Sequence, residues 1–123
     1  MKKLLILLFI LISFDTFAVE KETTFTSEVF NEAQKAGKTV VINSWNKTCG
    51  TCSAQIKVLQ EAEKEFNDVL FLSFEQTKDK DIAKFFNIDF WTTIVVYKNN
   101  VEVARIIGQT DKSLIYSTIK KGI

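Results

Sequence analysis

The only two cysteines of this 123-residue chain, Cys49 and Cys52, follow an apolar run that ends at Trp45. The residues after Cys52 have the spacing of an amphipathic helix, so the pair lies at a junction between a strand and a helix. A helix N-terminus presents unpaired N–H groups and the positive end of the helix dipole, which favour a thiolate over a thiol. A bridge across so short a loop removes little entropy from the unfolded chain. The spacing therefore predicts redox chemistry rather than a stabilising staple.

Apolar patterning along the rest of the chain predicts alternating helices and strands. The run 40–42 suits a strand buried on both faces, and Asn99 and Asn100 tolerate the positive φ of a tight hairpin. The expected helices cover 28–36, 49–66, a short segment with Ile82, Phe85 and Phe86, and 111–121, and the expected strands cover 39–45, 69–74, 93–97 and 101–107. The sequence thus predicts an α/β fold with a mixed central sheet and helices on both faces, in which a βαβ unit precedes a β-hairpin and a C-terminal helix.

The first eighteen residues have the pattern of an export signal. Lys2 and Lys3 precede the apolar run 4–14, which is shorter than the roughly 20 residues of a spanning helix, and small residues at 16 and 18 suit a signal peptidase. We expect 1–18 to be a signal peptide cleaved near Ala18, which leaves one domain at 19–123 in the periplasm or otherwise exported. An uncleaved N-terminal anchor is the rival interpretation, and it is the only contact with a membrane that we expect.

Composition limits the chemistry that this chain can perform. It has no histidine, which excludes Ser-His-Asp and Cys-His catalytic groups and every metal site that contains histidine. Its 16 basic residues are nearly balanced by 15 acidic residues, so nothing indicates binding to nucleic acid. No cofactor is expected.

The stretch around the cysteines resembles the active site of the thioredoxin family. That family has a hydrophobic strand ending in Trp, two or three polar residues and Cys-Gly-Pro-Cys, and here 40–45, 46–48 and Cys49-Gly50-Thr51-Cys52 stand in those places. The segments 88–94 and 98–100 and Gly108 fall where the family has its substrate loop, its hairpin and its closing glycine. The resemblance extends over almost all of 19–123 and implies a thioredoxin-like fold.

The resemblance also implies roles for the residues around the thiols. Cys49 would be the exposed attacking thiolate and Cys52 the more buried resolving thiol, in a cycle that passes through a mixed disulfide with a partner protein. Gly50 and Thr51 lie between them, and Gly50 is expected to let the backbone turn tightly into the helix. Trp45 is expected to pack beneath the thiols, and Lys47 either adds a favourable charge or is a solvated loop lysine.

Two departures from the family pattern affect the same site. Asn43 stands where the family has a buried Asp that assists proton transfer at the resolving cysteine, and an amide cannot act as a base. Thr92, within the expected substrate-binding loop Trp91-Thr92-Thr93, stands where the family has a cis-proline. Because a cis bond before a non-proline residue costs about 3 kcal/mol, we expect the Trp91–Thr92 peptide to be trans.

These features predict an exported thiol-disulfide oxidoreductase. We expect it to reduce or isomerise disulfides in a restricted set of partner proteins, because the changed loop alters docking. In relatives of this fold an exported reductase receives its electrons from a membrane relay, so the resemblance implies such a donor. Two alternatives remain open: a metal or iron-sulfur protein that uses the same two thiolates, with two chains completing the ligand set, and a redox-inert adaptor with a structural bridge.

Overall fold

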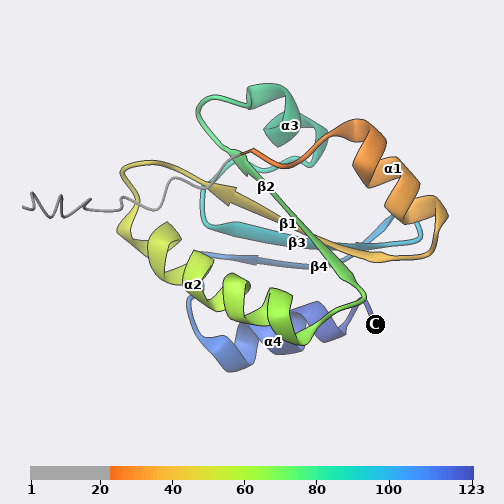
Figure 1. The fold of residues 1–123 in the computed structure, drawn as a ribbon. Coiled ribbons are helices and arrows are strands. Elements are labelled where there is room, and N and C mark those ends of the chain that lie inside the picture. The colour runs from red at the N-terminus through yellow and green to blue at the C-terminus, as the bar shows by residue number, and fades with distance from the viewer. Residues whose placement is uncertain (1–22) are drawn as a thin grey trace, which may run out of the picture.

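The fold places a four-stranded mixed sheet between two pairs of helices (Figure 1). The structure is a computed structural model that describes residues 23–123. The expected signal peptide and its cleavage site lie outside the described residues. The elements follow in the order α1 (Ser27–Lys35), β1 (Thr39–Trp45), α2 (Gly50–Glu65), β2 (Val69–Glu75), α3 (Lys80–Phe85), β3 (Thr93–Lys98), β4 (Val101–Ile107) and α4 (Lys112–Lys120). The predicted elements are all present, with bounds that differ by a few residues at most.

The sheet has the strand order β2-β1-β3-β4. β1 pairs in parallel with β2, as the helical crossover α2 requires, whereas β3 pairs antiparallel with both β1 and β4. Asn99 and Asn100 join β3 to β4 with φ values of 51° and 62°, which confirms the hairpin. β1 is an inner strand of the sheet and is buried along its whole length. Its C-terminal end leads through residues 46–49 into α2.

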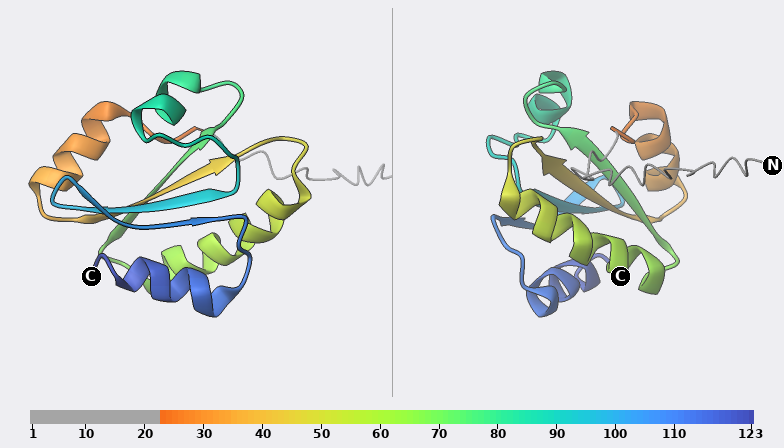
Figure 2. Two further views of the ribbon diagram at one scale, coloured as in Figure 1. Left: turned by 180° about the vertical axis from the view of Figure 1, so that it is seen from behind. Right: turned by 60° about the vertical axis from the view of Figure 1, so that its left-hand side comes forward.

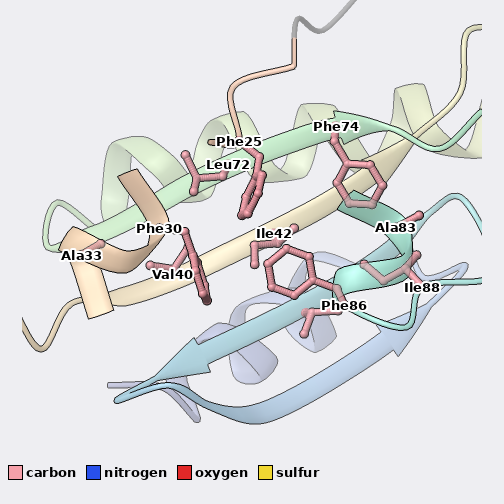
Figure 3. Packing of buried hydrophobic residues seen from close by; sticks show 11 residues of the cluster. Phe25, Phe30, Ala33, Val40, Ile42, Leu72, Phe74, Ala83, Phe86 and Ile88 are labelled. Atoms are coloured by element: carbon pink, nitrogen blue, oxygen red, sulfur yellow. The ribbon is translucent and has the colours of Figure 1, made fainter. Parts of the chain in front are cut away.

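The two faces of the sheet carry separate cores, because successive side chains of β1 point to opposite sides. Figure 2 shows α1 and α3 on one face and α2 and α4 on the other. Val40 and Ile42 pack beneath α1 and α3 in a cluster rich in phenylalanine, part of which is drawn in Figure 3. Val41 packs with α2 and α4 residues such as Leu59 and Ile119. Asn43 and Trp45, further along β1, share the face of Val41 and so lie under α2.

The two phenylalanines at the end of α3 differ in burial. The Phe85 side chain is 61% exposed, whereas Phe86 is 1% exposed. α3 is only six residues long, and the chain turns inward at its C-cap, Phe86. Within residues 23–123 no helix is long and apolar enough to cross a lipid bilayer.

Candidate active site

Cys49 and Cys52 form a disulfide at the N-terminus of α2. Cys49 is the N-cap residue, and its Sγ accepts a hydrogen bond from the Cys52 backbone N–H at 3.0 Å. Cys49 is half-buried, whereas Cys52 is almost completely buried. After reduction, a thiolate at Cys49 would face the unpaired N–H groups of the helix and remain within reach of a partner, while Cys52 would stay shielded from solvent.

The approach to Cys49 is shaped by Asn46, a residue that the sequence did not single out. Its Oδ1 accepts hydrogen bonds from the Thr48 backbone N–H at 3.1 Å and from the Thr48 hydroxyl at 3.2 Å. The Cys49 N–H in turn donates to the Asn46 carbonyl at 3.3 Å. This is the local pattern by which asparagine stabilises turns, so an Asn directly after the last strand residue, Trp45, was the available signal.

The floor of the site is apolar. Trp45 and Ile56 are buried together with Cys52, and Cys49 packs against them. Trp45 thus has the packing role that was predicted for it, and its buried Nε1 has no hydrogen-bond partner among the described residues. Lys47 and Thr51 are exposed on either side of Cys49.

Gly50 does not have the role that the sequence suggested. Its φ lies outside the left-handed region, and a Cβ placed on it would meet no atom within 4 Å. The entry into α2 therefore does not require glycine at this position, because Cys49 as N-cap already makes the turn with extended dihedral angles.

Asn43 belongs to a buried amide network that extends from β1 to α2. Its Nδ2 donates to Gln55 Oε1 at 2.8 Å and, over a longer 3.4 Å, to the Ser44 carbonyl. Gln55 Nε2 donates to the Thr92 carbonyl at 3.0 Å and to the Gln109 carbonyl at 2.9 Å. Asn43 Oδ1 is buried with no partner within the described residues. The network therefore links the strand before the cysteines, the helix that carries them and the loop at Thr92.

The loop before β3 has an unusual conformation at Thr92. No peptide bond among the described residues is cis, which confirms the trans Trp91–Thr92 bond, but Thr92 has φ 63°. The Thr92 N–H donates to the Ser44 carbonyl at 2.8 Å, and Thr93 Oγ1 donates to the Phe90 carbonyl at 2.6 Å. Thr92 and Thr93 are buried by this arrangement, whereas Phe90 and Trp91 are 62% and 46% exposed.

A second glutamine anchors the start of the same loop. Gln76 Nε2 donates to the Ile88 carbonyl at 2.8 Å, and its Oε1 accepts from the Ser44 hydroxyl at 2.7 Å. The Gln76 N–H donates to the Trp45 carbonyl at 2.8 Å. The loop 88–93 is therefore attached to the end of β1 at both of its ends, and it presents Phe90 and Trp91 to solvent.

Comparisons with known proteins agree with this geometry. The sequence profile of the family described as Thioredoxin matches residues 17–121. The chain belongs to the thioredoxin family. It is 37% identical over 84 residues to a thioredoxin of Mycoplasma genitalium, covering 68% of this chain and 82% of that protein, and 29% identical over 90 residues to a thioredoxin H-type of Fagopyrum esculentum, covering 73% and 78%.

Solved structures support the same fold. A structure described as Trxlp from Edwardsiella tarda superimposes with a TM-score of 0.73 at 23% identity, covering 77% of this chain and 94% of that one. Fasciola hepatica thioredoxin gives a TM-score of 0.71 at 22% identity, covering 78% and 89%. As a thioredoxin-family member with a bridged Cys49–Cys52 pair, the protein is a thiol-disulfide oxidoreductase.

The described part of this thioredoxin-family protein offers nothing in support of the metal-binding alternative. Within residues 23–123 no group of three or more Cys, His, Asp and Glu side chains is placed to hold a metal ion. The shifted pKa values also concern other parts of the fold. Burial raises the pKa of Tyr97, which pairs with Val40 at the end of β1 away from the cysteines.

Proposed function

We propose that this thioredoxin-family protein is exported and reduces or isomerises the disulfides of a restricted set of partner proteins. The observation that carries the proposal is the exposed aromatic pair Phe90 and Trp91 on the loop before Thr92. In the family this loop pairs with the substrate backbone, so side chains exposed on it touch the partner. Two large aromatic rings favour partners with an apolar surface next to the disulfide and disfavour polar ones.

The exchange cycle follows from the burial of the two sulfurs. The Cys49 thiolate attacks a partner disulfide, one partner sulfur leaves as a thiolate, and a mixed disulfide forms between Cys49 and the other. Cys52 then attacks Cys49 Sγ, which releases the partner as a dithiol and forms the Cys49–Cys52 bridge seen here. Asn43 supplies no base for the Cys52 proton, so water must accept it, and we expect this second step to be slow.

The direction of electron flow is part of the proposal. A histidine between the two cysteines would stabilise the Cys49 thiolate and make the disulfide strongly oxidising. The residues between them are Gly50 and Thr51, which favours a reducing or isomerising role. A reducing or isomerising role needs a supply of electrons outside the cytoplasm. We assign this supply to a membrane relay that reduces the Cys49–Cys52 bridge.

A disulfide exchange assay tests the proposed chemistry. Reduced protein starting at residue 19 is expected to reduce oxidised glutathione, while it reduces insulin several-fold more slowly than Mycoplasma genitalium thioredoxin does. A Cys52→Ala variant should accumulate the mixed disulfide, since Cys49 is left without its resolving thiol. Equal insulin rates for the two proteins would contradict the restricted specificity. No reaction above free dithiothreitol, with no trapped mixed disulfide, would contradict the exchange cycle itself.

Export is tested separately. Expression of the full chain in a Gram-negative host should yield periplasmic protein whose N-terminus, read by mass spectrometry, is Val19. A Leu7→Arg variant, which places a charge in the apolar run, should remain in the cytoplasm with residues 1–18 attached. An intact N-terminus on membrane-bound protein would instead favour the uncleaved anchor.

A further inference from the structure

Gln55 occupies a position where an apolar residue would be expected. It lies on the buried side of α2 with Cys52, Ile56, Leu59 and Ala62, and its exposed fraction is 0%. It follows Cys52 by three residues, so the two side chains lie one turn apart on the same side of the helix. A buried amide that made no hydrogen bonds would cost about 1–3 kcal/mol. Gln55 avoids this cost by bonding to Asn43, Thr92 and Gln109.

The directions of these bonds are fixed by their partners. The Thr92 and Gln109 carbonyls can only accept, so both hydrogens of the Gln55 NH₂ group point at them. Gln55 Oε1 therefore points toward residue 43, and it can form a hydrogen bond there only with a donor. The NH₂ group of Asn43 is that donor. The two amides form a matched pair, and the chain's asparagine at position 43 is explained by the glutamine at position 55.

At Thr92 the hydrogen bonds of this network hold the backbone in an unfavourable conformation. Left-handed backbone costs a non-glycine residue roughly 1–2 kcal/mol, and a β-branched residue is rarely found there. Thr92 is held at φ 63° because its carbonyl accepts two hydrogen bonds, one from the Gly108 N–H at 2.9 Å and one from Gln55 Nε2. Because this loop has no proline ring to fix its backbone, Gln55 contributes a restraint of another kind.

We propose that Gln55 is a positioning residue for exchange with protein disulfides. It fixes the docking loop at Thr92 relative to the helix that carries Cys49 and Cys52, so that a partner chain lying along the loop presents its disulfide to Cys49. The inference rests on the docking role proposed above for residues 90–93. A small disulfide has no chain to lie along the loop, and its reaction with Cys49 does not depend on Gln55.

The test compares two buried glutamines. Gln55→Met keeps the length of the side chain and removes all three hydrogen bonds. Gln34→Met is the matched control, because Gln34 is also buried, donates to the Lys38 carbonyl at 3.2 Å and accepts from the Asn100 N–H at 2.7 Å, yet lies in α1 on the other face of the sheet. The protein starting at residue 19 is used for both, and second-order rate constants are measured with insulin and with oxidised glutathione.

Gln55→Met is expected to lower the insulin rate constant about tenfold, since misplacement of a reacting group has effects of this order, and to change the glutathione rate constant by less than about threefold. Hydrogen exchange of the Thr92 and Gly108 amides should accelerate in this variant. Gln34→Met should leave both the ratio of the two rate constants and these two amides unchanged. If Gln55→Met does not fold, Gln55→Asn keeps a buried amide that is too short to reach all three partners.

Three results would overturn the inference. One is an equal loss of both rate constants in Gln55→Met, which is what general destabilisation of the site gives. Another is unchanged exchange of the Thr92 and Gly108 amides, which would show that Gln55 does not hold the loop. The third is faster amide exchange with an unchanged insulin rate constant, because the loop would then be held by Gln55 without helping a protein disulfide to react. The proposed exchange cycle fails separately, if the native protein itself gives no mixed disulfide with Cys49.

Discussion

Replacing Asn43 by aspartate, the residue of the family pattern at this position, is expected to destabilise this protein at neutral and alkaline pH. A carboxylate at position 43 would face Gln55 Oε1, an acceptor whose orientation is fixed by the Thr92 and Gln109 carbonyls. The side chain at this position is almost completely buried, so the charged form also loses its hydration. Both effects disfavour the carboxylate and raise the pKa of the introduced carboxyl group. The expected loss at pH 8 is about 3 kcal/mol.

The stability of Asn43→Asp relative to the native protein is expected to fall as the pH rises. Below the unfolded-state pKa of about 3.9 the carboxyl group is protonated in both states, and its O–H can donate to Gln55 Oε1 as the Asn43 amide does. The variant and the native protein should then be similarly stable. As the pH rises through the interval between the unfolded-state pKa and the raised folded-state pKa, the variant loses about 1.4 kcal/mol per pH unit, and the loss is constant above the folded-state pKa.

Urea unfolding of the two proteins between pH 4 and pH 9 measures this difference. Asn46→Asp is the control, because the Asn46 side chain acts as an acceptor toward Thr48 and a carboxylate can do the same. Its stability relative to the native protein should hardly change with pH. If Asn43→Asp were as stable as the native protein at pH 8, the orientation of the Gln55 amide derived above would be wrong.

The parts of this fold that the sequence predicted are those determined by neighbours along the chain. The apolar run in β1, the cysteines at the start of α2 and the asparagines of the hairpin each act through local periodicity or local backbone preference. Asn43 and Thr92 were identified because a family pattern exists to compare them with. Their positions were predicted, but what surrounds them was not.

Gln55 was missed because its partners are distant in sequence. Asn43 lies 12 residues before it, and Thr92 and Gln109 lie 37 and 54 residues after it. The available signal was a polar residue on the apolar side of the helix, three positions after Cys52. A single polar residue there does not change the apolar periodicity that predicts the helix, so it gives little indication of a network. Phe85 and Phe86 show the opposite difficulty. Adjacent phenylalanines at the end of a six-residue helix give no periodicity from which to decide which one is buried.

The second large effect is expected from Phe86→Ala. Figure 3 shows Phe86 between α3 and the sheet, and its ring lies 5.2 Å from Phe25, 5.3 Å from Phe30 and 5.3 Å from Tyr97, measured between ring centroids. All three contacts are edge-to-face or close to it, the geometry that aromatic rings prefer. Removing a fully buried phenylalanine leaves a cavity and costs about 3–5 kcal/mol, a large share of the roughly 5–15 kcal/mol that stabilises a domain.

Phe85→Ala is the matched control, because it removes the same atoms from the neighbouring position. Phe85 also contacts Phe86, with ring centroids 4.9 Å apart, but most of its surface is already in water, so its loss should cost about 1 kcal/mol. Thermal and urea unfolding measure both values. Equal losses in the two variants would mean that Phe85 contributes as much to the stability of this cluster as Phe86 does, despite its exposure.

Phe86→Ala also separates stability from chemistry. Phe86 packs on the face of the sheet that carries α1 and α3, whereas Trp45 and the α2 residues Cys52 and Gln55 are buried on the other face. Well below its midpoint of unfolding, the variant should therefore reduce oxidised glutathione at nearly the native rate. With insulin the rate should fall modestly, because the Ile88 N–H donates to the Ala83 carbonyl and so ties the start of the docking loop to α3. A glutathione rate that fell in proportion to the lost stability would show that the two faces of the sheet are coupled.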